Sequence, residues 1–134
     1  MNAASNDDDL ILDTIDRFLV RDVEPHVMEL EHNDIWPEEI VAKMAELGLF
    51  GAIIKEEYGG LGLSCLTYAK IVERVSRTWM SLSGIFNSHL IMAYALQRFG
   101  TEEQRREWLP KFASGEMRGG LALTEPSCGT DLQA

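Results

Sequence analysis

The residues best suited to chemistry lie close together near the C-terminal end of the chain. They read Thr124-Glu125-Pro126-Ser127-Cys128-Gly129-Thr130-Asp131, with three hydroxyl groups among turn-forming residues. Pro126 and Gly129 favour a tight loop, and such loops can present backbone N–H groups and hydroxyls to a phosphate or to the polar edge of a ring. Because the same residue types are common in ordinary turns, the pattern alone favours a structural turn over a binding loop.

The remaining reactive side chains show no catalytic or metal-binding spacing. The histidines and cysteines are His26, His32, His89, Cys65 and Cys128. Their separations do not match a metal site or a disulfide framework, so we expect neither. Cys128 has no neighbouring base to activate it as a nucleophile, and Glu125 is expected to hold its loop rather than transfer protons. His89 could be either a core residue or a pocket wall.

The segments that must position this loop are predicted to be helices. Ile11, Ile15 and Phe18 share one helical face, so a helix should begin at the acidic residues 7–9, which would occupy its first turn. Pro25 should end or kink this helix. A second helix is expected to start with Pro37 at its first position and to stop at Gly48.

Three more helices are predicted after the glycine-rich stretch 59–62. One follows Ser64 through Trp79, and the next runs from about Ser81 to Arg98. The second of these is apolar or small nearly all round, so it should lie in the middle of a bundle. A capping box of Thr101 and Gln104 opens the fifth helix, which Pro110 should bend or shorten. The three tryptophans, at 36, 79 and 108, are expected in the core.

The chain changes character after Glu116, where an extended segment and the turn-rich loop replace the helical periodicity. We therefore predict an all-α fold class. Residues 1–116 should form a helical bundle of about five helices, and residues 117–134 should be the first strand and loop of a truncated β domain. An unpaired strand would leave backbone groups without partners, which indicates that the β domain is incomplete.

Composition narrows the possible functions. The formal net charge is −10, and no basic stripe is present that could bind nucleic acid. Apolar runs are too short for a membrane span. The N-terminal residues 1–9 are polar and acidic, unlike a secretory signal or a mitochondrial presequence, so we expect a cytoplasmic protein.

Four stretches, in order along the chain, resemble motifs of the acyl-CoA dehydrogenase family. Residues 121–131, Leu-Ala-Leu-Thr-Glu-Pro-Ser-Cys-Gly-Thr-Asp, resemble the family signature [AL]-x-[TS]-E-P-x-x-G-S-D. Residues 57–62 resemble its E-Y-G-G-x-G loop, residues 99–104 its F-G-T-E-E-Q helix start, and residues 109–116 its L-P-x-L-A-S-G-E stretch. Together they cover much of the chain, and the chain is identified as an N-terminal part of such a protein.

The resemblance implies a subunit of three parts: a helical domain, a β domain and a second helical domain. FAD would bind between the last two, in a homo-oligomer that is a tetramer or a dimer. The implied reaction is α,β-dehydrogenation of an acyl-CoA thioester, with an electron-transfer flavoprotein as electron acceptor. The catalytic carboxylate would come from the C-terminal domain, so no residue of this chain is expected to be catalytic.

The resemblance also assigns binding roles by motif position. Leu121 and Thr124 would meet the pyrimidine edge of the flavin, with Leu123 packed nearby. Thr130 stands where the family usually has serine, and its hydroxyl would contact the FAD diphosphate and approach the CoA chain. Threonine keeps that hydroxyl but adds a methyl group and restricts χ1.

The helix from Ser81 to Arg98 corresponds to the one that lines the acyl cavity in the family. Phe86, His89 and Met92 are therefore candidate substrate-binding residues, together with Thr130. Two alternatives remain open at this point. The chain could belong to an acyl-CoA oxidase or flavin monooxygenase on the same scaffold, or it could be a stand-alone, non-catalytic helical fragment.

Overall fold

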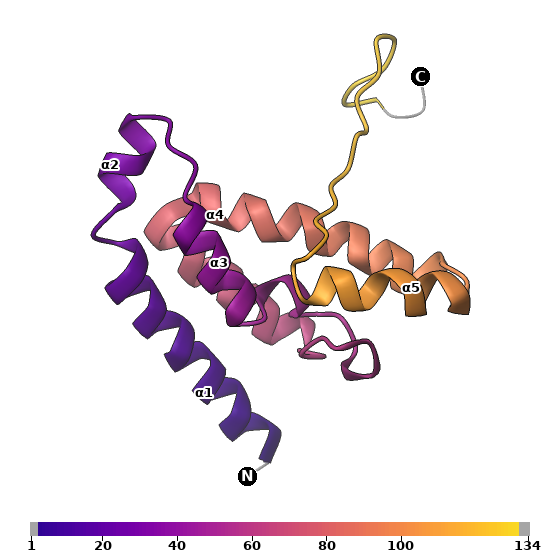
Figure 1. Cartoon of the computed structure of the whole chain (residues 1–134), viewed down its shortest axis with the longest axis horizontal. Helices are drawn as coiled ribbons and strands as arrows, with labels where there is room; N and C mark the ends of the chain where they lie inside the picture. Colours follow the sequence, from indigo (N-terminus) through magenta and orange to yellow (C-terminus); the bar gives the residue numbers. More distant parts are fainter. Residues whose placement is uncertain (1–2, 132–134) are drawn as a thin grey trace.

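The computed structural model describes residues 3–131, with side chains from residue 7 onward. Its elements are α1 (Ala3–Phe18), η1 (Leu19–Val23), α2 (Val27–His32), α3 (Glu38–Glu46), η2 (Leu49–Gly51), η3 (Glu56–Tyr58), α4 (Cys65–Phe99) and α5 (Glu102–Ala113). The described part therefore holds five α-helices and no strand, and the predicted all-α class is confirmed (Figure 1). A division of the chain at residue 116 stays a prediction.

Helix α1 begins earlier than its sequence pattern indicated. It starts at Ala3, so the acidic residues 7–9 lie beyond the first turn, and that expectation was wrong. The side chain of Asp8 instead accepts a hydrogen bond from the Thr67 hydroxyl at 2.8 Å, which ties α1 to the start of α4. The helix widens into the π-helical turn η1, and Pro25 follows its end as predicted. A carboxylate near a helix start can thus serve a tertiary contact rather than the helix dipole.

Helices α2 and α3 frame a short connection. The six-residue α2 was not predicted, and it has no buried residue that would give a periodic signal. Helix α3 starts at Glu38, with Pro37 as its N-cap rather than its first residue, so the predicted start was one position early. Gly48 adopts φ 75° just after α3, as expected for a helix stop that needs a left-handed residue.

The two predicted helices between Ser64 and Arg98 are two halves of the 35-residue α4, which is kinked at Trp79. Trp79 has φ −155° and ψ 103°, an extended conformation inside the helix. Its indole N–H donates to the carboxylate of Glu31 on α2. Asp16 of α1 pairs with Arg74 at 3.1 Å, so α1 lies along the first half of α4. The kink directs the second half toward α5 (Figure 1).

Helix α5 opens with the predicted capping box. The Thr101 hydroxyl accepts from the Gln104 N–H at 3.2 Å, and the Gln104 side chain accepts from the Thr101 N–H at 2.8 Å. The helix continues past Pro110 to Ala113, so Pro110 does not end it at that position. The helix returns along the second half of α4, and Leu109 and Phe112 enter the core that the two share.

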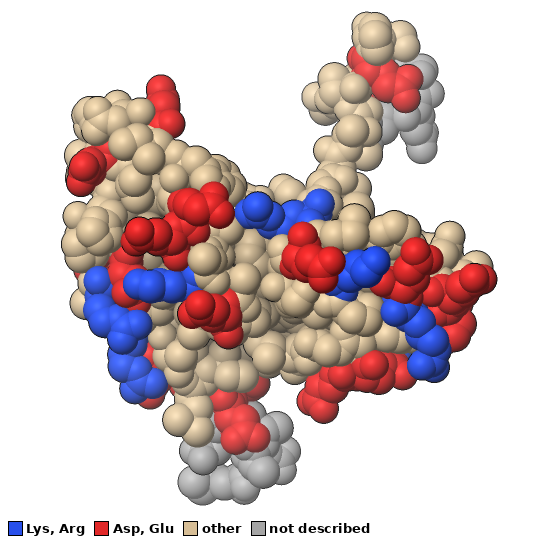
Figure 2. All heavy atoms as spheres, in the orientation of Figure 1, with Lys and Arg blue, Asp and Glu red and all other residues tan. Residues whose placement is uncertain are grey.

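The second half of α4 is covered on one side and open on the other. Leu82, Phe86, Leu90 and Ala93 are buried, whereas Gly84, Ser88, Ile91 and Tyr94 are exposed or partly exposed. The second half of α4 was predicted to lie in the middle of the bundle, but only one of its faces is buried there. Acidic and basic side chains are interspersed on the face drawn in Figure 2. Among the described residues, no helix is long and apolar enough to cross a membrane.

Candidate functional site

The segment that leads to the signature loop is anchored to the helices just before it leaves them. The Met117 N–H donates to the Lys111 carbonyl at 3.1 Å. The Arg118 guanidinium lies 5.7 Å from the centroid of the Trp36 ring and 6.0 Å from that of Phe50, within range of cation–π attraction. Trp36 is 51% exposed, so its predicted place in the core was wrong. We call residues 117–119 the strap.

His89 lies where the strap crosses α4, and its ring is fully buried. Its Nε2 atom is 3.1 Å from the carbonyl oxygens of both Phe50 and Phe112. The backbone N–H of Gly119 donates to Nδ1 at 3.1 Å. The rings of Phe50 and Phe112 contact the imidazole edge-on, each at 5.4 Å between centroids. This candidate substrate residue therefore has both ring nitrogens engaged by backbone groups of the same chain.

The surroundings of His89 oppose a positive charge on its ring. Burial lowers the pKa of His89 below its ordinary value of 6.5, and the nearby Arg118 cation lowers it further. The two carbonyl partners act in the opposite direction but do not outweigh burial. The imidazole is therefore neutral at neutral pH, when it can donate through one ring nitrogen and accept through the other.

The other two candidate substrate residues on α4, Phe86 and Met92, lie on either side of His89 along the helix. Phe86 is fully buried and meets Tyr68 edge-on at 6.3 Å between ring centroids. Met92 is half-buried and lies so close to Gly119 that a Cβ atom there would be 2.2 Å from the Met92 Cε. Met92, like His89, thus touches the strap through its side chain, whereas Phe86 packs in the core.

The signature loop itself lies beyond the strap and away from the helices (Figure 1). Leu121, Leu123, Thr124 and Thr130, the candidate cofactor residues, are all exposed. Glu125 and Cys128 form an isolated antiparallel bridge, with N–H to carbonyl distances of 2.9 and 3.2 Å. Pro126 and Ser127 form the tip of this tight turn, as the sequence indicated. The loop is folded locally and displays its hydroxyl and apolar side chains outward.

The structure therefore brings three of the four substrate candidates together on α4, but it leaves Thr130 and the other cofactor candidates apart from them on the loop. The link between the two groups is the strap, which lies between two of the family-like motifs and belongs to neither. Arg118 and Gly119 have no periodicity or ligand-like spacing that would have marked them. The hydrogen bonds of His89 depend on the tertiary structure, because Gly119 is 30 residues away in the sequence, Phe50 is 39 away and Phe112 is 23 away.

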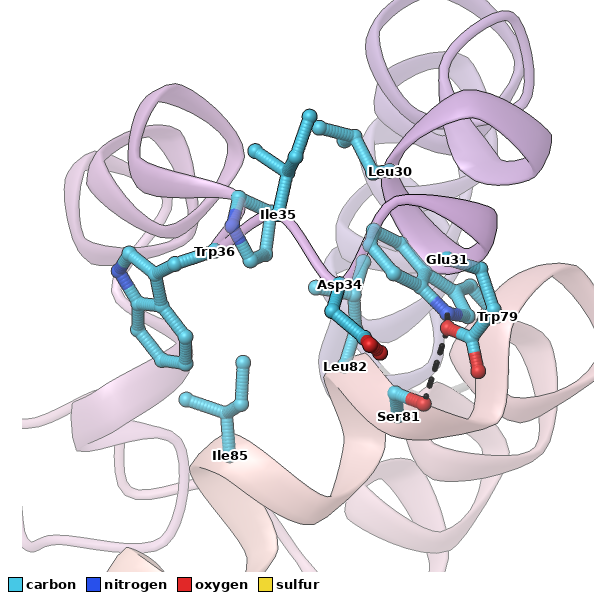
Figure 3. Close-up of a pocket in the computed structure, with 10 residues that line it drawn as sticks. Leu30, Glu31, Asp34, Ile35, Trp36, Trp79, Ser81, Leu82 and Ile85 are labelled. Carbon is cyan, nitrogen blue, oxygen red and sulfur yellow. Dashed lines mark hydrogen bonds between the residues drawn. The ribbon is translucent and has the colours of Figure 1, made fainter.

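A separate hollow of about 360 Å³ lies at the kink of α4. Figure 3 shows Trp36 and Ile85 on one side of it and Trp79 with Ser81 on the other, beside the carboxylate of Glu31. Glu31 accepts hydrogen bonds from both Trp79 and Ser81, so it holds the kink in place. Asp34 adds a second carboxylate to the lining, which disfavours an anionic ligand. We assign this hollow to the kink rather than to cofactor binding.

Comparison with known proteins identifies the family. A model of the family described as "Acyl-CoA dehydrogenase, N-terminal domain" matches residues 5–116. This chain belongs to that family. A probable acyl-CoA dehydrogenase of Bacillus subtilis is 40% identical over 124 residues, which is 91% of this chain and 21% of the relative.

Solved structures agree with the family assignment. A chain in a structure of the electron transferring flavoprotein of Acidaminococcus fermentans superposes with a TM-score of 0.89 and 33% identity, covering 100% of this chain and 35% of that one. An acyl-CoA dehydrogenase of Bacillus anthracis, complexed with FAD, gives a TM-score of 0.79 and 34% identity, covering 95% and 22%. The chain thus spans about a fifth to a third of these relatives.

Proposed function

We propose that this chain is the N-terminal part of an FAD-dependent acyl-CoA dehydrogenase, which removes hydrogens from the α and β carbons of an acyl-CoA thioester. The observation that carries this proposal is the signature loop, which is folded by the Glu125–Cys128 bridge and held out from the helices with Thr124 and Thr130 exposed. Membership of the family and the FAD complex of a structural relative support it.

The exposed groups of the loop suit a flavin nucleotide. Thr124 and Thr130 offer hydroxyls that can donate to a ring oxygen or to a phosphate, and Leu121 and Leu123 offer apolar contact. We propose that Leu121 and Thr124 bind the pyrimidine edge, that Leu123 packs beside it, and that Thr130 contacts the diphosphate. When bound, FAD supplies the hydride-accepting chemistry, and this chain supplies binding and orientation.

We propose that the acyl chain passes along the second half of α4. Of the predicted substrate residues, Met92 is half-buried and could contact a ligand directly, while Phe86 and His89 lie behind it in the core. Thr130 would approach the CoA part of the substrate. No residue of this chain is proposed as catalytic, and the proton-abstracting carboxylate is expected from another domain.

The expected partners follow from the family. We propose an electron-transfer flavoprotein as electron acceptor, in line with the structure of such a protein that contains a chain similar to this one. A homotetramer or homodimer, a cytoplasmic location and a role in fatty acid β-oxidation remain predictions.

The first experiment is to isolate the protein from its native source, measure its intact mass and record its visible spectrum. A subunit well above 15.1 kDa with a bound flavin, bleached by acyl-CoA under anaerobic conditions, would support the proposal. A native mass of 15.1 kDa without flavin would contradict it and favour the stand-alone fragment. Rapid reoxidation of the reduced flavin by oxygen would favour an oxidase or a monooxygenase instead.

A further inference from the structure

His89 receives three backbone contacts from three different segments of the chain. Phe50 of η2 and Phe112 of α5 each place a carbonyl oxygen 3.1 Å from Nε2. Gly119 of the strap places its N–H 3.1 Å from Nδ1. Because the ring is fully buried, water cannot replace any of these partners without opening the core.

The chemistry of the three partners determines where the imidazole carries its proton. A carbonyl oxygen can only accept, so Nε2 must bear the hydrogen that it shares between Phe50 and Phe112. A backbone N–H can only donate, so Nδ1 must offer a lone pair to Gly119. The neutral Nε2–H tautomer satisfies all three contacts. The other neutral tautomer fails at both nitrogens, and the imidazolium cannot accept from Gly119.

We infer that His89 is a positioning residue, which fixes the strap to α4 through Gly119 and thereby sets where the signature loop leaves the helices. Gly119 is two residues before Leu121, the first of the proposed flavin contacts. The inference rests on the proposed function only for its flavin part. In this inference His89 does not contact the substrate directly, and it acts through the backbone of the strap instead.

The strap has few other attachments, which makes this hydrogen bond important. Apart from the Met117 N–H to Lys111 carbonyl bond and the stacking of Arg118, the described contacts of residues 117–119 are those with His89 and Met92. Residues 120–127 beyond the strap are all exposed. A buried histidine that merely completed the core would need only the two carbonyl contacts, so the Gly119 bond is the distinguishing feature.

Two substitutions of His89 test its two kinds of contact separately: the hydrogen bond from Gly119 at Nδ1, and the hydrogen bonds to the carbonyls of Phe50 and Phe112 at Nε2. In His89→Asn, the amide oxygen is bonded to the same carbon as Nδ1 is in histidine, so it can still accept from Gly119 but the carbonyls lose their donor. In His89→Gln, the longer amide can place its nitrogen near the position of Nε2, so the carbonyls keep a donor but the acceptor for Gly119 is displaced. The readout is hydrogen exchange of the Gly119 amide, normalised to buried α4 amides such as that of Leu90.

We expect His89→Gln to speed exchange at Gly119 roughly fivefold relative to Leu90, the effect of one lost hydrogen bond of ordinary strength. His89→Asn should leave that ratio within about twofold of the wild type, even though it lowers the stability of the core. If the exchange rates of the Gly119 and Leu90 amides change by the same factor in both variants, His89 is only a core residue and the inference is overturned.

Nitrogen NMR of the unaltered protein gives a second test that does not depend on a variant that folds. The ring of His89 should show a protonated Nε2 and a bare Nδ1 at neutral pH. A protonated Nδ1 would overturn the inference, because that atom could then not accept from Gly119.

The flavin part is tested in the complete enzyme. His89→Gln should raise the dissociation constant of FAD more than His89→Asn does. If the Gly119 effect is present but FAD binding is the same in both variants, the flavin part is overturned. If the wild-type protein contains and binds no FAD, the proposed function fails, while the exchange and NMR results still decide the contact between His89 and Gly119.

Discussion

Gly60 shows how a single residue determines whether the loop before α4 can close. A Cβ atom at this position would lie 2.1 Å from the carbonyl oxygen of Ile54, closer than real atoms approach. Neighbouring Tyr58 is buried, and its hydroxyl donates to Glu102 of α5 at 3.1 Å. Two of the stretches that resemble family motifs therefore contact each other, and in this chain their role is structural.

Gly60→Ala should lower the free energy of unfolding by at least about 2 kcal/mol, because the backbone of Ile54 must move to admit the methyl group. Gly59→Ala is the matched control: φ is 84° and a Cβ atom there would meet no other atom within 4 Å, so only left-handed strain of about 1 kcal/mol is expected. Urea unfolding measures both. Equal losses in the two variants would contradict the steric explanation.

The buried His89 should make stability depend on pH. Its pKa in the folded state is lowered by burial and by Arg118, so the unfolded chain binds the proton first as the pH falls below 6.5. The stability is therefore complete above that pH and decreases below it, by at most about 1.4 kcal/mol per pH unit. Urea unfolding at about pH 7.5 and about pH 5.5 should show this decrease.

His89→Gln should flatten this pH dependence, since it removes the titrating ring. Titration of Asp22 does not contribute to the slope in this pH range. Its pKa is held below the ordinary 3.8, mainly by the hydrogen bond from Arg21 and next by the hydrogen bond from Lys43. Its contribution would be lost only at more acidic pH. An unchanged slope in His89→Gln would assign the pH dependence to other groups.

At the scale of the elements, periodicity and capping predicted most helices, and tertiary contacts explain what they missed. The helical character of α4 and the stop of α3 at Gly48 could be predicted from local rules. The start of α1 at Ala3 could not, because the apolar face that indicates the helix begins only at Ile11.

In the candidate site, too, some features could be predicted from the local sequence and others depend on tertiary contacts. The tight turn of the signature loop could be predicted from Pro126 and Gly129. The strap could not be, because its partners Trp36, Phe50 and His89 are remote in sequence and converge only in the folded chain.

The capping box of α5 offers a test at this scale. Thr101→Ala should cost about 1 kcal/mol of stability, since the Gln104 N–H loses its acceptor at the helix start. Thr101→Ser keeps the hydroxyl and should restore most of the loss. Thermal unfolding of the three proteins measures the difference, and a loss as large in the serine variant would contradict a capping role.

At the scale of the whole molecule, the chain is a helical bundle with one open face and one projecting loop. Gly84, Ile91 and Tyr94 remain exposed on α4, and the signature loop carries its own exposed leucines. Such surfaces fit the proposal that this chain binds FAD and substrate together with other domains.

Thr124→Val in the complete enzyme should weaken FAD binding roughly tenfold, because a hydrogen bond to the flavin edge would be lost while the shape of the side chain is kept. Thr130→Ser, which removes only a methyl group, should bind FAD about as well as the wild type. Fluorescence titration of the apoenzyme measures both constants. Unchanged affinity in Thr124→Val would contradict its proposed contact.

The anchoring of the chain at residues 117–119 has a consequence for limited proteolysis. Residues 119–131 contain no lysine or arginine, so trypsin cannot cut within the signature loop, and the site just before it is Arg118, which stacks on Trp36 and Phe50. Leu121 and Leu123 are about half exposed on a segment outside the helices, where a protease that cuts at leucine can act without opening the core. Chymotrypsin should therefore trim the signature loop well before trypsin does, and leave the helical bundle intact.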